Sequence, residues 1–251
     1  MKITLQHNSS IYQANLTQAI DISISLEVDQ VGPNCFWAPP FSASPVISGD
    51  WIGDTTNGGD VNFKNVNINP HGNGTHTECV GHIAKEKVTI NEVLTDYHHI
   101  AQLITIFPTR LDNGDRVITK TQIEEFLEGQ IPPALIIRTL PNTDDKIRRV
   151  YSGTNPPYVE AEALTLIREA GITHLLLDLP SVDREQDDGK LAGHKAFWDY
   201  PATIDKKKTI TEMVFVNNNV SDGLYLLNLQ IASFEIDASP SKPVLYELEE
   251  I

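Results

Sequence analysis

The chain has 251 residues, 40% of them hydrophobic, and a formal net charge of −15 at pH 7. A chain of this length and composition can bury a sizeable core, and no repeat or long linker divides it, so we expect one domain, residues 1–251. The negative charge repels polyanions, which excludes nucleic acid and anionic membranes as expected partners. The one tight basic run, DKKK at residues 205–208, is typical of a solvated turn.

Two further features indicate the compartment. The longest apolar runs fall far short of the ~20 residues that a membrane-spanning helix needs. The beginning, MKITLQHNSSIYQ, lacks the apolar region of a signal peptide. Cys35 and Cys79 do not make a disulfide framework in a chain this long, and we expect both to be reduced. These features predict a soluble, cytoplasmic protein.

The expected elements in the first half of the chain are short. AIDISISLEV at residues 19–28 and VNFKNVNIN at residues 61–69 are strand-like runs between clusters of Gly, Pro, Asn and Asp. INEVLTDYHHIAQL at residues 90–103 and QIEEFLEGQ at residues 122–130 predict two helices. This half therefore combines short strands with helices.

The middle of the chain shows the clearest architecture. PALIIRT at residues 133–139 and ITHLLLD at residues 172–178 are apolar, strand-like runs, and residues 158–171 between them carry apolar side chains at helical spacing. This order predicts a parallel β-α-β unit. Two further strands are expected at residues 209–218 and 224–236. The fold class is therefore α/β, a single domain with a mixed β-sheet and flanking helices.

The segment NPHGNGTHTECVGHI, residues 69–83, holds three histidines, a glutamate and a cysteine. It is either a polar surface loop rich in histidine or a set of ligands. If the second half is extended, His76 and Glu78 project from the same face, and Val80 and His82 follow on that face.

The chemistry of these side chains favours a metal. Imidazole nitrogen and carboxylate oxygen suit Zn²⁺ and Mn²⁺, and one carboxylate can bridge two ions. The Asn, Gly and Pro residues before the strand allow the backbone to curl, so that His71 approaches the same point as His76.

Two side chains far downstream raise the same question. Both faces of TITEMVFV, residues 209–216, are largely apolar, so Glu212 is expected to be buried. A buried, unpaired carboxylate costs several kcal/mol, and its partner is then a lysine or arginine, or a metal ion. His194, in KLAGHKAFWDY, is by itself more typical of a helix surface or a core than of a metal site.

Other reactive or aromatic side chains have simpler explanations. Cys79 should face away from the His76 side of the strand, which favours a small buried hydrophobe over a thiolate ligand or nucleophile. Phe36, Trp37 and Trp51 lie in Pro/Gly-rich loops, where they either flank a flat substrate or pack against the sheet. A surface or structural position is the default for His7, His98, His99 and His174.

The sequence resembles the metal-dependent cyclase family, which includes bacterial kynurenine formamidases and isatin hydrolases. That family is marked by HxGTHxDxPxH, which GTHTECVGH matches at Gly74, Thr75, His76, Glu78 (in place of Asp) and His82. Collinear likenesses cover most of residues 20–245: IDISISL resembles the opening strand, PALIIRT a central strand, LLLDLPSVD an Asp-x-Pro-Ser-Val-Asp stretch, and EIDASPSKPV a Gly-Ala-Asp-Gly-Ser-Pro segment.

The resemblance implies a swivelling β/β/α-like fold and a homodimer or higher homo-oligomer. It also implies that one or two divalent ions, Zn²⁺ or Mn²⁺, are bound by His76, Glu78, His194 and Glu212, with Glu78 bridging two ions. His82 would be the catalytic acid/base, a role that suits a side chain titrating near neutral pH.

Three departures from the family pattern matter. The family's first metal histidine falls on Gly72, so either His71 takes its place or a ligand is lost. Residues 79–81 replace those that usually precede the last histidine, including a proline. The two downstream ligands stand further apart than in the family, which suggests an insertion around DYPATIDKKK.

We therefore expect a metal-dependent amidohydrolase. Its substrate would be an N-formyl arylamine or a cyclic amide, with metal-activated water as nucleophile and His82 moving the proton. No G-x-S-x-G elbow indicates serine chemistry. The alternative, motivated by Gly72, is a non-catalytic relative that binds a metal or a small ligand. A scaffolding protein gains no support, because the sequence has no coiled-coil heptads and no long charged tail.

Overall fold

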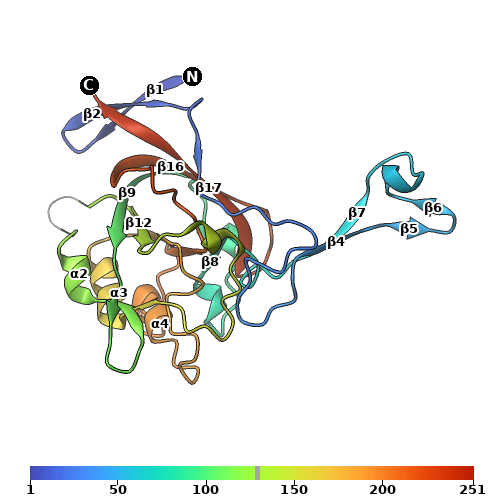
Figure 1. Ribbon diagram of the computed structural model, residues 1–251. Coiled ribbons are helices and arrows are strands. Elements are labelled where there is room, and N and C mark those ends of the chain that lie inside the picture. The colour runs from blue at the N-terminus through green and yellow to red at the C-terminus, as the bar shows by residue number, and fades with distance from the viewer. Residues whose placement is uncertain (128–130) are drawn as a thin grey trace.

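The computed structural model describes residues 1–127 and 131–251, and seven strands close into a ring at its centre (Figure 1). The order around the ring is β17 (Ala238–Glu250), β16 (Gly223–Ile231), β9 (His98–Ile106), β12 (Ala134–Thr139), β14 (His174–Leu177), β15 (Thr209–Glu212) and β8 (His76–Cys79). β8 also pairs with β17, which closes the ring. β9, β12, β14 and β15 run parallel, and the other neighbours pair antiparallel.

The parallel part of the ring is buried on both faces, which explains its nearly continuous apolar sequences. Every residue of β12, β14, β15 and β8 is buried. β12 and β14 pair in parallel, with Ala134 opposite His174, and α3 (Ala161–Glu169) connects them. The predicted β-α-β unit is confirmed.

Three helices lie together on one side of the ring: α2 (Lys120–Glu124), α3 and α4 (Ala192–Trp198) (Figure 1). α3 packs against both neighbours and buries Ala163, Leu164 and Ile167 on one stripe. α4 buries Phe197 and Trp198 in the same core as the strands. Among the described residues, no helix is long and apolar enough to cross a membrane.

The other elements are short or extend the ring. β1 (Lys2–His7), β2 (Ser10–Asn15) and β3 (Ile20–Asp21) continue the sheet from β17, and a small sheet joins β10 (Thr109–Arg110), β11 (Arg116–Ile118) and β13 (Tyr158–Val159). The short helical turns are α1 (Ile90–Val93), η1 (Thr55–Asn57), η2 (Val80–His82) and η3 (Asp144–Arg148).

A two-stranded ribbon projects from the body, as Figure 1 shows at the right. β4 (Ser42–Pro45) pairs with β7 (Lys64–Asn67), and β5 (Ile47–Ser48) pairs with β6 (Trp51–Ile52) at the tip. We call residues 42–67 the arm.

The prediction of a helix at residues 90–103 is wrong. Only α1 is helical there, and β9 begins at His98 between β12 and β16. Ile100, Leu103 and Ile104 fit helical spacing, but strand pairing on both sides overrides that local pattern.

Most other expected elements are present in shorter form. Of the helix expected at residues 122–130, α2 covers the beginning, and residues 128–130 lie outside the described residues. The helix expected at residues 158–171 begins later, because Tyr158 and Val159 form β13. The strands expected at residues 19–28, 61–69, 209–218 and 224–236 correspond to β3, β7, β15 and β16. Cys35 and Cys79 are both free, as expected.

A buried ion pair ties η3 to the ring. Asp178, directly after β14, accepts hydrogen bonds from the backbone N–H and the hydroxyl of Thr139, each at 2.8 Å. Lys146 Nζ donates to the same carboxylate at 2.7 Å. Burial opposes both charges, which raises the pKa of Asp178 and lowers the pKa of Lys146. The pair is therefore stable only with all its contacts in place.

We predict that Asp178→Asn lowers the free energy of unfolding by about 3–5 kcal/mol, because it leaves the Lys146 ammonium buried without a counter-charge. Lys120 and Glu124 form an exposed pair that serves as a matched control, and Glu124→Gln should cost less than about 1 kcal/mol. Urea unfolding measures both. Equal costs at the two sites would contradict this account.

Candidate metal centre

The segment before β8 folds into a tight turn that aims His71 back at the strand. The side-chain oxygen of Asn69 accepts from the backbone N–H of Gly72 at 3.1 Å, and the backbone N–H of Asn69 donates to Oδ1 of Asn73 at 2.8 Å. Gly74 then adopts the left-handed region, with φ at 70°, which glycine reaches without strain. The predicted curl of the backbone is confirmed.

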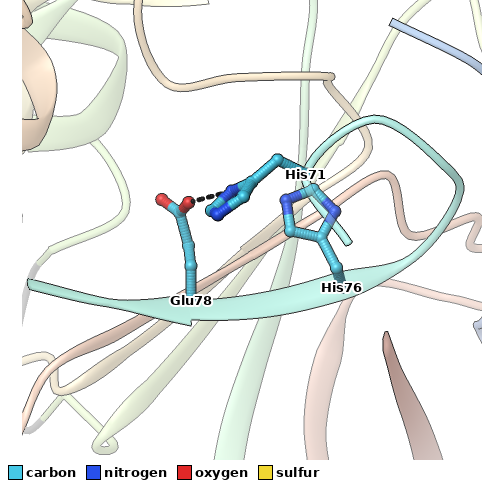
Figure 2. Close-up of side chains that lie close together, drawn as sticks. All are labelled: His71, His76 and Glu78. Atoms are coloured by element: carbon cyan, nitrogen blue, oxygen red, sulfur yellow. Dashed lines mark ion pairs between the residues drawn. The ribbon is translucent and has the colours of Figure 1, made fainter. Parts of the chain in front are cut away.

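His76 and Glu78 project from one face of β8 toward the ring of His71 (Figure 2). Nδ1 of His71 lies 3.0 Å from Oε2 of Glu78, and the ring centroids of His71 and His76 are 5.4 Å apart. The common face of His76 and Glu78 is confirmed. The expectation that Val80 and His82 continue it is wrong, because the chain leaves the strand and forms the turn η2.

Gly72, where the family pattern places a histidine, packs tightly against the body. A Cβ at this position would lie 2.2 Å from the Cβ of Ala38, so no side chain fits without movement. The adjacent His71 points at Glu78 instead. Of the two alternatives, a lost ligand or a replacement, the geometry favours replacement by His71.

Closure of the ring brings two downstream elements to β8. Glu212, at the end of β15, lies opposite His76 in register, and its Oε2 is 3.4 Å from Nε2 of His76. Nε2 of His194, on α4, is 3.1 Å from Oε1 of Glu78. The structure thus brings together all six predicted site residues: His71, His76, Glu78, His82, His194 and Glu212.

In three of the histidines, one ring nitrogen contacts a protein acceptor and the other ring nitrogen faces the cluster. The committed contacts are His76 Nδ1 to the backbone oxygen of Gly74 (3.0 Å), His71 Nε2 to Oδ2 of Asp237 (2.7 Å) and His194 Nδ1 to Oδ2 of Asp183 (2.6 Å). Such acceptors fix the orientation and tautomer of an imidazole, and they are the usual support of a metal-bound histidine.

Three groups of ligand atoms overlap in the cluster, and within each the ligand atoms lie within 4.8 Å of one another. Two triads share Glu78: one consists of His71, His76 and Glu78, the other of Glu78, His82 and His194. The third group consists of His71, His82 and Asp237. Nε2 of His76 is buried and makes no hydrogen bond within the described part of the chain. Because orphaned buried polar atoms are costly, a divalent cation fits this donor set.

Glu212 is buried beside the triads and not within them. Its Oε1 accepts from the backbone N–H of Val182 at 3.1 Å. No lysine or arginine among residues 1–127 and 131–251 forms an ion pair with it, so the salt-bridge explanation is wrong. Its role as a ligand stays a prediction.

The charges around Glu78 favour a cation. Burial alone would raise the pKa of Glu78, but the surrounding histidines, His82 foremost, hold it well below its usual range. Burial opposes the charged form of His71, yet Asp237 and Glu78 outweigh it and raise the pKa of His71 to about 10. The carboxylates beside His194 likewise outweigh its burial and raise its pKa to about 10. The site therefore attracts positive charge, which suits a divalent ion.

His82 lies at the solvent-exposed edge of the cluster. Its Nδ1 is 3.4 Å from Oδ2 of Asp237 and 3.9 Å from Oε2 of Glu78. The same oxygen of Asp237 contacts His71, so one carboxylate orients both histidines. Sequence reasoning missed Asp237, which comes beside β8 only because β17 pairs with that strand. In the sequence, only the likeness of EIDASP to a family segment pointed to Asp237, and that likeness gave this residue no role.

The cluster opens into a cavity of about 380 Å³. Phe36, Leu191 and Arg184 line it together with the ligand side chains. Phe36 thus takes the position expected of an aromatic that flanks a flat substrate. Trp51 does not, because it packs against Phe63 in the arm, with ring centroids 6.2 Å apart.

Cys79 faces the core and not the cluster. Its Sγ lies 3.7 Å from the backbone oxygen of Val88, and burial raises the pKa of the thiol to about 12. The expectation of a small buried hydrophobe is confirmed, and a thiolate nucleophile is not supported.

Comparisons with known proteins agree with this geometry. A family model described as "Putative cyclase" matches residues 15–184. Three solved structures, each 16% identical to this chain, have a similar fold. A "Potential Metal-Dependent Hydrolase With Cyclase Activity" has a TM-score of 0.66, and the match covers 92% of this chain and 98% of that one. A "predicted metal-dependent hydrolase" from Bacillus stearothermophilus has a TM-score of 0.64, with 91% and 98% covered, and isatin hydrolase A from Labrenzia aggregata has a TM-score of 0.65, with 92% and 94% covered. No curated protein sequence matches the chain. At this identity the structures show the fold, and the expected α/β class is confirmed.

The contact between Gly72 and Ala38 gives a test of how the turn is built. We predict that Gly72→Ala lowers the free energy of unfolding by about 1–3 kcal/mol, because the new Cβ overpacks the turn. Most of this loss should disappear in a chain that also carries Ala38→Gly. Urea unfolding of wild type, Gly72→Ala, Ala38→Gly and the double variant measures the coupling free energy between the two positions. A loss that is the same in both backgrounds would show that Ala38 is not the obstacle.

Proposed function

The chain belongs to the putative cyclase family, and from this premise we propose that it is a metal-dependent hydrolase that cleaves the amide bond of an N-formyl arylamine or a cyclic amide. The observation that carries the proposal is the pair of ligand triads that share the buried carboxylate of Glu78. The similar structures support it by their names, which include metal-dependent hydrolases and isatin hydrolases. Isatin is itself a cyclic amide.

The six side chains divide between holding metal and moving protons. In our proposal His71, His76 and Glu78 would hold one ion, Glu78 and His194 would contribute to a second site, and Glu212, beside His76, would be a further ligand. Zn²⁺ or Mn²⁺ suits these side chains. Bound divalent ions supply a water of lowered pKa and a polarised carbonyl oxygen. The remaining steps rest on the chain's own groups.

His82 is placed to move the proton. It is the exposed histidine of the cluster, it lines the cavity, and Asp237 orients its Nδ1. In our proposal His82 accepts the proton of the attacking water and delivers it to the departing amide nitrogen, which is a very poor leaving group without it. A group with this task must reach substrate, whereas His71, His76 and His194 are tied to acceptors behind them.

Other side chains of the cavity would bind and orient the substrate. Phe36 and Leu191 present apolar surface beside the ligands, which suits the flat ring of an aryl or fused-ring amide. Arg184 is held by Asp115, with its Nε 3.0 Å from Oδ2, so its position at the cavity is fixed.

A non-catalytic homologue that binds a metal or a small ligand is the second candidate. The observation in its favour was Gly72 at a ligand position, and the placement of His71 beside Glu78 weakens it. The exposed position of His82 at the cavity, where it can reach a substrate, favours the hydrolase.

One set of variants tests the proposal. We predict that dialysed wild-type protein retains up to about two divalent ions per chain and that His71→Ala loses at least one, because that imidazole contributes to the first triad. His82→Gln should keep the metal and lower kcat by about 10²- to 10⁴-fold on formamides and cyclic amides. His98→Gln, at an exposed histidine outside the cluster, should match wild type. Elemental analysis and hydrolysis assays give the two readouts.

The outcomes separate the two candidates. No tightly held ion in a folded wild-type protein would sink the hydrolase proposal. A full complement of metal with no hydrolysis of any amide in the panel would favour the binding homologue. If His82→Gln loses metal along with activity, His82 is a ligand and the assignment of the proton step is wrong.

A further inference from the structure

Two further histidines meet at the beginning of the parallel strands, and we call them the histidine pair. The ring centroids of His99 on β9 and His174 on β14 are 3.9 Å apart, with the ring planes tilted by 39°. Between these strands lies β12, whose first residue, Ala134, pairs with Ala101 of β9 and with His174. His99 stands two residues before Ala101, so both histidines project from the same face of the sheet. The small side chain of Ala134 leaves room for the two rings to meet.

The histidine pair is separate from the metal centre. His174 pairs in register with Thr209, the first residue of β15, whereas Glu212 is the last residue of that strand. Because they stand three residues apart on one strand, Thr209 and Glu212 face opposite sides of the sheet. The cavity beside the histidine pair and the cavity of the metal centre share no lining residue. The histidine pair is therefore no part of the cluster around Glu78.

The histidine pair borders a cavity of about 810 Å³, which is ample for a metal ion with its water molecules. His174 is 7% exposed, and His99 is half-buried. The charged side chains of the walls are two carboxylates and two ammonium groups, those of Glu92, Asp96, Lys206 and Lys207. Their formal charges cancel, so the walls do not select a ligand by charge. The nitrogens of the two imidazoles remain as the groups that can choose it.

Each ring of the histidine pair has one nitrogen in contact with the protein and one without. Nε2 of His99 lies 2.9 Å from the backbone oxygen of Asp96. Because a carbonyl oxygen only accepts, this Nε2 carries the hydrogen, and Nδ1 of the neutral ring holds a lone pair. Nδ1 of His174 lies 2.9 Å from the hydroxyl of Thr209, which can accept, so Nε2 of His174 can hold a lone pair too. Contacts of this kind are the usual support of a metal-bound histidine.

The surroundings keep both rings neutral. Burial, together with the charges of His99 and Lys208, lowers the pKa of His174 to about 3. Burial also lowers the pKa of His99, although the contact with Asp96 opposes this shift. Neutral imidazole is the form that coordinates a metal ion. Both rings are therefore available as ligands at neutral pH.

We propose that His99 and His174 together bind one divalent transition-metal ion, with water and the carboxylate of Asp96 as its other ligands. Imidazole suits Ni²⁺, Cu²⁺ and Zn²⁺, whereas Mg²⁺ and Ca²⁺ prefer oxygen ligands. Two histidines are fewer protein ligands than either triad of the metal centre offers, so this ion exchanges readily and dialysis removes it. Once bound, it links the beginnings of β9 and β14 across β12. This inference does not depend on the proposed hydrolase activity.

Calorimetric titration of the dialysed full-length protein with Ni²⁺ tests the proposal. Wild type should bind one Ni²⁺ ion that His99→Gln and His174→Gln each bind at least about 10-fold more weakly, since even an outer-shell partner contributes that much to metal affinity. His98→Gln is the matched control and should bind as wild type does. His98 is exposed at the same cavity, and its Nε2 contacts Asn228. Since His99 is only half-buried, His99→Gln gives a folded variant even where His174→Gln does not.

The variant His71→Ala keeps this site apart from the metal centre. It should bind the Ni²⁺ ion as wild type does, and adding His99→Gln to it should remove that binding. Thermal unfolding gives a second readout. Because the ion binds the folded chain, excess Ni²⁺ should raise the Tm of wild type and of His71→Ala more than the Tm of His99→Gln.

Two outcomes would overturn the proposal. One is a wild type that binds no Ni²⁺ beyond its tightly held ions. The other is equal binding by wild type, His99→Gln and His174→Gln, which would show an adventitious ion only. A dialysed wild type without tightly held ions would bear on the proposed function alone, because the readout here is the difference between wild type and His99→Gln.

Discussion

The buried carboxylate of Glu78 is the constraint on which the site depends. A carboxylate removed from water is stable only when opposite charge or hydrogen bonds surround it. Three imidazoles approach its oxygens, at 3.0 Å from His71, 3.1 Å from His194 and 3.9 Å from His82. Aspartates in turn hold the far sides of His71 and His194. The cluster therefore consists of a buried carboxylate, a layer of imidazoles around it and a layer of aspartates behind them.

Closure of the ring provides this arrangement. β8 pairs with β15 on one side and with β17 on the other, which places Glu212 opposite His76 and Ala238 opposite Glu78. A slip of one residue in either pairing would turn both ligands of β8 to the other face. The backbone hydrogen bonds that stabilise the ring are thus the same bonds that position the ligands. The arm lies outside this frame, and its chemistry is that of a surface and not of a core.

Local patterns in the sequence predicted the parts of the site that depend on local geometry. Strand alternation placed His76 and Glu78 on one face, and turn-forming residues indicated that His71 would curl back toward them. The apolar context of Glu212 predicted its burial. The sequence did not predict the roles of Asp183 and Asp237, because these roles arise from contacts with residues far away in the sequence. For Asp237 the contact depends on the pairing of β17 with β8. The helix expected at residues 90–103 failed for the same reason, since two neighbouring strands decide the conformation of β9. The arm begins within an uncharged stretch, residues 31–48, but no local rule shows that the arm leaves the body.

The proposed function requires that Glu78 would be shared by two divalent ions. Crystals of the full-length protein grown with Mn²⁺ and measured at a wavelength where manganese scatters anomalously test it most directly. The account predicts two anomalous peaks, one on each side of the Glu78 carboxylate, with His71 and His76 at the first and His194 at the second. A single peak remote from Glu78, or no peak in a crystal whose ligand side chains are ordered, would contradict it.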